Sequence, residues 1–161
     1  SYVECLVAKK PSSAMKALQV FLIVLAVIFF LLSMLNALMW LGVAAAGIGA
    51  YFTSLNASVE FEYLFAEGGL SVDRILGKAK RKKIFDCEKD DIQIVAPADS
   101  FVLKDYEKQG MKIKDFSSGR KDAKVYALIY QKGPDHFKVL IEPNERMIGA
   151  MRRTFPRKLV M

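Results

Sequence analysis

The hydrophobic pattern divides the chain into two parts of different character. No Asp, Glu, Lys or Arg occurs from Ala17 to Val59, an uncharged stretch of 43 residues. A single helix over so many residues would be far longer than the hydrocarbon core of a bilayer, which is about 30 Å thick and is crossed by roughly 20 residues. The stretch therefore predicts two helices joined by a tight turn, a transmembrane hairpin over 17–55.

The two predicted spans differ in composition. The first, residues 17–35, consists almost entirely of large aliphatic and aromatic side chains. The second, residues 37–55, carries Trp40 near one end and Tyr51 near the other, as the aromatic belts of membrane interfaces prefer. The polar residues of the intervening turn are Ser33 and Asn36.

A cleavable signal peptide and a hairpin buried in a soluble protein are the alternatives. A signal peptide has an apolar core of about 7–15 residues before a small-residue cleavage site. Here the small-residue segment AAAGIGA, residues 44–50, lies much deeper in the chain. A buried hairpin needs a large surrounding core, and the roughly 105 residues that follow it are too few to supply one. The membrane hairpin is therefore the preferred interpretation.

Small residues recur along one face of the second span. Gly42, Ala46 and Ala50 follow one another at intervals of four, a spacing that lets two helix backbones approach closely in lipid. They are candidate helix-packing residues, with the first span as their nearest partner. The large side chains at matching intervals there are Leu22, Leu25, Phe29 and Leu32. The same residues also fit a membrane helix without a specific contact, so both interpretations stay open.

Lysines near the ends of the hairpin predict its orientation. Lys9, Lys10 and Lys16 precede the first span, further cations follow the second, and the turn between the spans has none. The positive-inside rule then gives a multi-pass protein with both termini cytoplasmic. Cys5 and Cys87 would lie in a reducing compartment, where a disulfide is not expected.

Beyond residue 57 the hydrophobic period changes from helical to alternating. Apolar side chains alternate with glutamates, as in a half-buried strand, at Val59, Phe61, Tyr63 and Phe65. Glu67-Gly68-Gly69 predicts a hairpin turn, because glycine adopts positive φ without a steric penalty. Similar patterns predict further strands within residues 70–77, 80–87, 91–95, 111–116, 124–132 and 136–143.

Two helices complete the predicted domain. Asp99 as N-cap and Gly110 as a stop favour a short helix within residues 99–108. A C-terminal helix is expected over 144–155, with Asn144 and an acidic residue at its start, where acidic groups suit the helix dipole. Its apolar face consists of Met147, Ile148, Met151 and Phe155.

We therefore expect an α+β membrane protein. Its parts would be an N-terminal cytoplasmic segment over 1–16, the transmembrane hairpin over 17–55 and a cytoplasmic β domain over 57–161. In this domain about seven short antiparallel strands would form a strongly bent sheet or small β-barrel, with the C-terminal helix plugging its open end. The apolar segment 2–7 either packs on this domain or lies in the membrane interface, and its pattern does not decide which.

Four stretches carry a resemblance to known proteins: Tyr2–Val7, Phe61–Lys83, Lys114–Gly119 and Ile141–Lys158. Through them essentially the whole chain resembles a family of small Firmicutes membrane proteins without an assigned function. The order of elements after the hairpin resembles a bacterial pleckstrin-homology-like domain. The resemblance implies a bacterial origin and a location in the bacterial cytoplasmic membrane, and it supplies no catalytic residues.

The positive charge of the chain, formally +7, gathers partly in the run GKAKRKK after the second predicted strand. Basic clusters beside a membrane segment gain about 1 kcal/mol per Lys or Arg close to an anionic surface. The candidate lipid-surface residues are Lys78, Lys80, Arg81, Lys82, Lys83, Arg152, Arg153, Arg157 and Lys158. The run also fits the solvated side of a strand whose Ile84 and Phe85 point inward, so lipid contact stays open.

No residue pattern indicates catalysis, a metal or a cofactor. His136 begins a predicted strand, Cys5 and Cys87 lack spaced partners that would ligate a metal, and Asp90-Asp91 fits a solvated turn. Nucleic acid is not an expected partner, because no helix-turn-helix or ladder of stacking aromatics accompanies the positive charge.

The expected function is that of a membrane-anchored cytoplasmic binding or scaffold module without enzymatic activity. Its partners would be the lipid bilayer and either anionic lipid headgroups or a membrane or cytoplasmic protein. An anionic-lipid sensor at the inner leaflet is the alternative, followed by nucleic-acid binding or an unrecognised enzyme.

Overall fold

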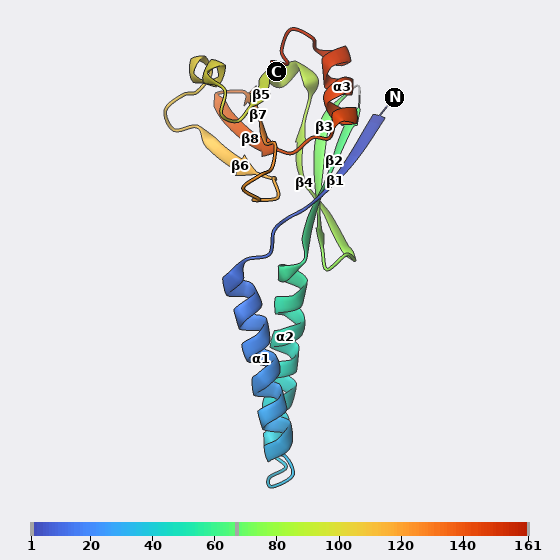
Figure 1. Ribbon diagram of the computed structural model, residues 1–161, viewed down its shortest axis with the longest axis vertical. Coiled ribbons are helices and arrows are strands. Elements are labelled where there is room, and N and C mark those ends of the chain that lie inside the picture. The colour runs from blue at the N-terminus through green and yellow to red at the C-terminus, as the bar shows by residue number, and fades with distance from the viewer. Residues whose placement is uncertain (1, 67, 161) are drawn as a thin grey trace. The chain divides into compact units, whose positions relative to one another are not determined.

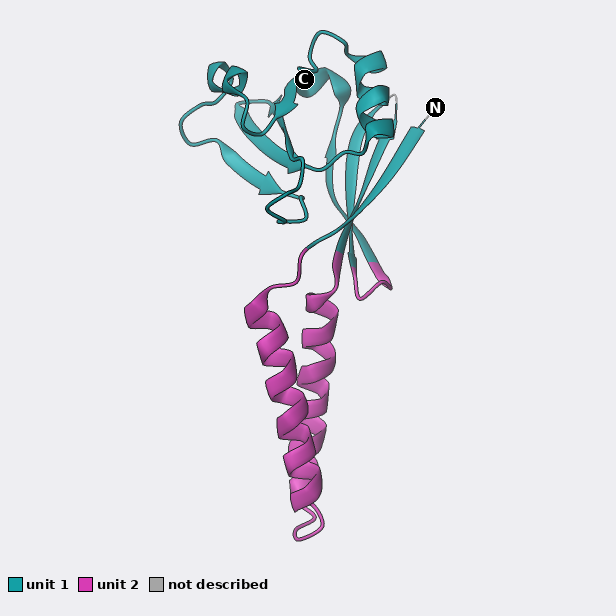
Figure 2. Ribbon diagram, viewed as in Figure 1, with its two compact units in different colours: residues 1–9, 60–75, 81–161 teal, residues 10–59, 76–80 magenta. Residues whose placement is uncertain are grey.

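The computed structural model describes residues 2–66 and 68–160 (Figure 1). The chain forms two compact units, which Figure 2 distinguishes by colour. The helical unit contains residues 10–59 and 76–80, and the β unit contains residues 1–9, 60–75 and 81–161. Each unit is described by itself.

The helical unit contains two helices that pack on each other, α1 (Ser13–Leu32) and α2 (Met39–Ala57). Their bounds differ by a few residues from the spans predicted at 17–35 and 37–55. Polar side chains form hydrogen bonds with the backbone of the loop between them. The Ser33 hydroxyl donates to the carbonyl of Phe30, and the Leu38 N–H donates to Oδ1 of Asn36 at 3.0 Å.

Both helices expose apolar side chains around most of their circumference. No residue of α1 is buried, and the described residues of α2 include only two buried ones, Ala46 and Thr53. Within the described part of the chain, α1 is the one helix long and apolar enough to cross a membrane, a property that signal sequences share. Glycines and the polar residues near its C-terminal end lower the mean hydropathy of α2.

The first sheet of the β unit has the strand order β1-β2-β3-β4. Its strands are β1 (Tyr2–Ala8), β2 (Val59–Ala66), β3 (Gly69–Leu76) and β4 (Lys80–Cys87). β1 and β2 pair antiparallel, from Tyr2 opposite Ala66 to Ala8 opposite Glu60. In the chain, the two helices are thus inserted between two strands that pair with each other. Segment 2–7, whose position the sequence pattern did not decide, belongs to this sheet.

The second sheet has the order β5-β7-β8-β6. Its strands are β5 (Ile92–Pro97), β6 (Lys112–Asp115), β7 (Tyr126–Lys132) and β8 (Asp135–Ile141). The remaining elements are the short 3₁₀ helices η1 (Lys89–Asp91) and η2 (Phe101–Asp105) and the helix α3 (Glu145–Thr154). The Asn144 side chain caps α3 by accepting the Met147 N–H at 2.8 Å, and α3 lies within the residues predicted for a C-terminal helix.

Aromatic rings from both sheets meet in the core of the β unit. Phe61 and Phe85 of the first sheet each lie with their ring centroid 5.6 Å from that of Phe116, which follows β6. Phe85 also contacts Tyr130 of β7, with centroids 5.3 Å apart. Ring pairs of this kind stabilise beyond the area they bury, so these contacts hold the two sheets face to face.

The opposite face of the second sheet is covered by the segment that follows β5. Leu103 of η2 packs there in a buried cluster with Ile94, Ala96, Ala127 and Ile129. β7 is therefore buried on both faces, which explains its unbroken run of buried residues from Tyr126 to Tyr130.

The fold corrects four predictions. The described strands number eight where seven were expected, because β1 joins the sheet, and the two sheets are not closed into a barrel. β6 pairs parallel with β8, which alternation cannot predict because it contains no strand direction. The helix expected within 99–108 is the shorter η2, whose cap is Ser100 rather than Asp99. The predicted turn 67–69 falls partly outside the described residues, since Glu67 is not among them.

Candidate functional site

The basic run lies on the β3–β4 turn and on β4, with the lysines exposed. Gly77 has φ 59° and Lys78 has φ 60°, and the Ala79 N–H donates to the carbonyl of Leu76 at 3.1 Å. Positive φ at both central positions of a two-residue hairpin is typical of a type I′ turn. Lys78 is the one non-glycine residue with positive φ in the described part of the chain.

This turn is attached to the end of α2. The Gly77 N–H donates to the carbonyl of Ser58 at 2.8 Å, and a Cβ on Gly77 would lie only 2.4 Å from Cδ2 of Leu55. The turn belongs to the same compact unit as the helices (Figure 2). Lys78 and Lys80 therefore lie at the end of the helical unit where α2 ends.

Some cations of the run form ion pairs with carboxylates, and others do not. The Arg81 guanidinium contacts Glu62 at 2.9 Å and Asp73 at 3.2 Å, and these carboxylates, Glu62 foremost, raise its pKa. Lys83 forms an exposed ion pair with Asp86 at 3.1 Å, a kind of pair that adds little stability. The side chains that form no ion pair or hydrogen bond with any described residue are Lys78, Lys80 and Lys82.

The predicted cations at the C-terminal end belong to a separate region of the β unit. Arg152 and Arg153 are exposed in the last turn of α3, and the Lys158 ammonium donates to the carbonyl of Lys89 at 3.4 Å. Arg157 is also exposed. Lys89 follows the end of β4, whereas Arg81 lies near its start. From Arg81 to Cys87, the last residue of β4, the strand rises roughly 20 Å at about 3.3 Å per residue, so Arg81 and Lys158 do not belong to one patch.

The small-residue face of α2 lies against α1. A Cβ on Gly42 would lie 2.8 Å from the Phe29 ring, and Ala46 is only 5% exposed. Ala50 is half-buried. The Gln19 side chain donates to the Ser54 hydroxyl at 3.2 Å, one turn of α2 further on. The two helices thus approach most closely where α2 lacks large side chains.

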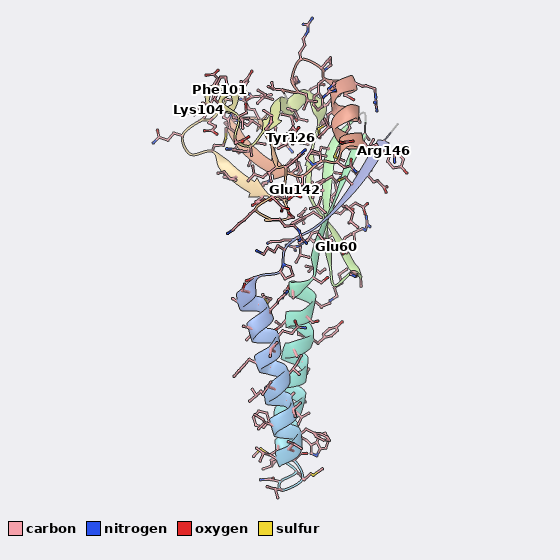
Figure 3. All side chains as sticks on the ribbon, viewed as in Figure 1. Glu60, Phe101, Lys104, Tyr126, Glu142 and Arg146 are labelled. Carbon is pink, nitrogen blue, oxygen red and sulfur yellow. The ribbon has the colours of Figure 1, made fainter. Side chains whose placement is uncertain are left out.

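A cleft of about 400 Å³ lies where β5 ends and β7 begins. Its lining residues are Pro97, Ala98, Asp99, Ala123, Lys124, Val125 and Tyr126. The Ala98 N–H donates to the carbonyl of Val125, another lining residue, at 2.9 Å. Tyr126, which also lines the cleft, is labelled in Figure 3. Sequence reasoning missed this cleft, because its two segments are distant in the chain and carry no motif.

A buried polar network joins the two sheets. The Tyr63 hydroxyl donates to the carbonyl of Phe116 and accepts the Glu142 N–H at 3.2 Å. The Glu142 carboxylate, labelled in Figure 3, accepts the Ser118 N–H at 2.7 Å and the Ser118 hydroxyl. The Cys5 thiol donates to the carbonyl of Glu142 at 3.8 Å. Burial raises the pKa of Tyr63, so its phenol stays protonated as a donor.

The two cysteine thiols lie in environments that lower their reactivity. Burial raises the pKa of the Cys5 thiol and raises that of Cys87 to about 12, so neither is a thiolate at neutral pH. His136 is half-buried, and its Nδ1 has no hydrogen-bond partner among the residues that the structure describes. Among the described residues, no group of three or more His, Cys, Asp or Glu side chains could hold a metal ion.

Comparison with known proteins agrees with this architecture. No curated protein and no solved structure matches the chain. A family model described as a bacterial PH-like domain, DUF6106, matches residues 1–161. This match includes the helices as well as both sheets and α3. The chain therefore belongs to the DUF6106 family of bacterial PH-like domains.

Proposed function

We propose that the protein is a membrane-anchored, non-catalytic binding module. The helical unit would span the bacterial cytoplasmic membrane as a hairpin, and the PH-like β unit would bind a partner at the cytoplasmic face. The proposal rests on the exposure of the helices. Their exposed large apolar side chains include Phe21, Val24, Ile28 and Leu31 on α1 and Leu41, Ile48 and Phe52 on α2.

Exposure of this kind fits lipid better than water. Monomeric soluble proteins rarely leave contiguous apolar patches larger than a few hundred Å² exposed. α1 and α2, with 20 and 19 residues, would each be about 30 Å long, which matches the hydrocarbon core. The inter-helix hydrogen bond between Gln19 and Ser54 satisfies two polar side chains that would otherwise face lipid.

The orientation follows from the cations. α1 begins and α2 ends at the same end of the helical unit, where Lys10, Lys16, Lys78 and Lys80 gather. The loop at the other end, residues 33–38, carries no charge. By the positive-inside rule the basic end would be cytoplasmic, and with it both chain termini and the β unit.

The binding role is supported by the family and by the shape of the β unit. PH-like membership is consistent with a recognition or scaffold domain, and the cleft beside Tyr126 offers a concave surface to a protein segment. A photo-crosslinking residue in place of Lys124, which lines the cleft, should give a discrete adduct in cells. Equal adducts from the exposed position Lys132 would contradict a specific site at the cleft.

A second candidate function is the sensing of anionic lipid at the inner leaflet. The unpaired and exposed lysines of the β3–β4 turn favour it, because the membrane surface would be the nearest polyanion to them.

Extraction of the full chain from cell membranes tests the anchor. We expect the protein to stay with the membrane pellet in alkaline carbonate and in high salt, and to be released only by detergent. Release by carbonate or salt would show peripheral attachment and overturn the proposed hairpin. A shortened or processed chain in the pellet would indicate that α1 acts as a signal sequence, and would also overturn it.

A further inference from the structure

We infer that the β3–β4 turn is a membrane-surface contact that places Lys78 and Lys80 against anionic phospholipid headgroups. The inference rests on the proposed insertion of the helical unit in the membrane. Within the basic run, Lys78 and Lys80 would contact headgroups, and Arg81, Lys82 and Lys83 would not.

The helical unit carries charge of one sign only. Residues 10–59 and 76–80 contain four cations and no carboxylate. The four cations are Lys10, Lys16, Lys78 and Lys80. Because the helices pack side by side with a short loop at one end, all four lie at the opposite end. A cluster of this kind, with no acidic residue in the same unit, is complementary to an anionic bilayer surface.

The turn is held in place at the end of α2 by backbone and side-chain contacts. Its Gly77 N–H donates to Ser58, the residue directly after α2, and Leu55 packs where a Cβ of Gly77 would be. Gly77 therefore has to be glycine for two reasons, its positive φ of 59° and the nearby Leu55 side chain. If the end of α2 lies in the membrane–water interface, these contacts hold the β3–β4 turn beside it.

The backbone conformation of Lys78 supports a functional role for the turn independently of its charge. Asn and Gly are the residues that type I′ turns favour, because a side chain with a Cβ is strained at positive φ. Lys78 has φ 60°, the one such non-glycine among the described residues. Local strain of this kind, at a site where a better turn former exists, is a pointer to function. Here the property that Asn or Gly would lack is the positive charge.

Ion pairs account for Arg81 and Lys83, two cations of the run that the inference omits, and Lys82 belongs to the β unit rather than to the helical unit. Arg81 is held by Glu62 and Asp73 on the first sheet, and Lys83 by Asp86. These two residues need no lipid to neutralise them. Lys78 and Lys80 have no such partner among the described residues, and each should strengthen contact with an anionic surface about fivefold.

The full chain, labelled through Ala79→Cys with an environment-sensitive fluorophore and reconstituted in vesicles, tests the inference. Cys5 and Cys87 are buried and serve as the unlabelled background. A quencher attached to lipid headgroups reports the distance of the turn from the surface. We expect stronger quenching in vesicles that contain phosphatidylglycerol than in phosphatidylcholine alone, and a return to the lower value at high salt.

The paired substitution Lys78→Asn with Lys80→Gln should abolish the effect of phosphatidylglycerol. Lys104→Gln with Lys121→Asn, two exposed lysines of the β unit, is the matched control and should preserve it. Lys78→Asn alone should leave thermal stability unchanged or raised, because Asn tolerates positive φ. Loss of stability without loss of the lipid effect would assign Lys78 a purely structural role and overturn the inference.

Flotation of the same samples separates this inference from the proposed anchor. A chain that floats with both vesicle types at alkaline pH, but whose label is indifferent to phosphatidylglycerol, overturns the headgroup contact and leaves the hairpin standing. A chain that fails to float with phosphatidylcholine vesicles overturns the hairpin, and with it the inference.

Discussion

At the scale of single residues, the hydroxyl of Tyr63 links the two sheets of the β unit. It is fully buried, donates to the carbonyl of Phe116 and accepts the N–H of Glu142. Tyr63→Phe would leave both backbone groups without a partner, and a buried unsatisfied polar group costs about 1–3 kcal/mol. We expect a lower thermal unfolding midpoint of the full chain in detergent. Tyr106→Phe, at a 36% exposed position, should change it little, and equal effects would contradict the role of the network.

A second residue-scale prediction concerns alkaline pH. Burial raises the pKa of Cys87 from 9.0 to about 12, and raises that of Tyr130 to about 12. The folded state therefore holds protons that the unfolded state releases as pH rises above 9. Stability from these groups is complete below pH 9 and is lost progressively towards pH 12.

Unfolding midpoints measured from pH 7 upward check this prediction. The decline above pH 9 should be shallower in Cys87→Ala than in the unsubstituted chain, whatever the stability of the variant at pH 7. An identical slope in the two proteins would show that Cys87 does not titrate as described.

At the scale of elements, the close approach of α1 and α2 depends on Gly42. A side chain there would collide with the Phe29 ring, whereas nothing lies within 4 Å of a Cβ on Gly47. Gly42→Leu should separate the helices and lower the yield of a short thiol cross-link between Gln19→Cys and Ser54→Cys. Gly47→Leu adds the same volume on the open side, and a similar drop in yield there would argue against specific packing.

β1 completes the first sheet of the β unit although it precedes the helices in the chain. It buries Val3 and Cys5 and covers the edge of β2. A chain of residues 58–161 should therefore lack cooperative unfolding. Residues 1–8 joined to 60–161 through an Asn-Gly turn should restore it, since Ala8 and Glu60 are paired neighbours. Thermal melting of the two proteins, followed by circular dichroism, tests this expectation. A cooperative transition of 58–161 alone would show that the β unit does not need β1.

The alternating patterns of the sequence predicted most strands, and their limits have physical causes. β4 occupies the predicted residues 80–87, because its apolar and polar positions alternate towards its end. β1 alternates equally, but its partner lies beyond the helices, and periodicity contains no pairing information. The same limit hid the parallel pairing of β6 with β8.

From the sequence, the basic run could be predicted only as a cluster of positive charges, without the contacts of its individual side chains. Sequence identified the basic run but could not divide it, because the partners of Arg81 come from β2 and β3. Nor could it show that Lys78 adopts positive φ, since Gly-Lys is not a preferred type I′ pair. The Glu142 network was visible only as two motifs, KDFSSG and IEPN, far apart in the chain.

At the scale of the whole molecule, chain connectivity has a consequence for function. The helices leave the β unit from β1 and return to it at β2, and these strands are hydrogen-bonded neighbours. Both ends of the hairpin are thus tied to one strand pair, with only residues 9–12 and 58 between strand and helix. A membrane anchor of this kind would tether the PH-like unit by two short links, which restricts its distance from the bilayer.

The decisive measurement is the side of the membrane on which each part of the chain lies. In spheroplasts, a membrane-impermeant maleimide should label Asn36→Cys in the loop between the helices. It should label Asp122→Cys, in the loop before β7, only after the membrane is permeabilised. The unsubstituted chain, with two buried cysteines, gives the background. Labelling of both positions from the same side would contradict a membrane-spanning hairpin with a cytoplasmic β unit.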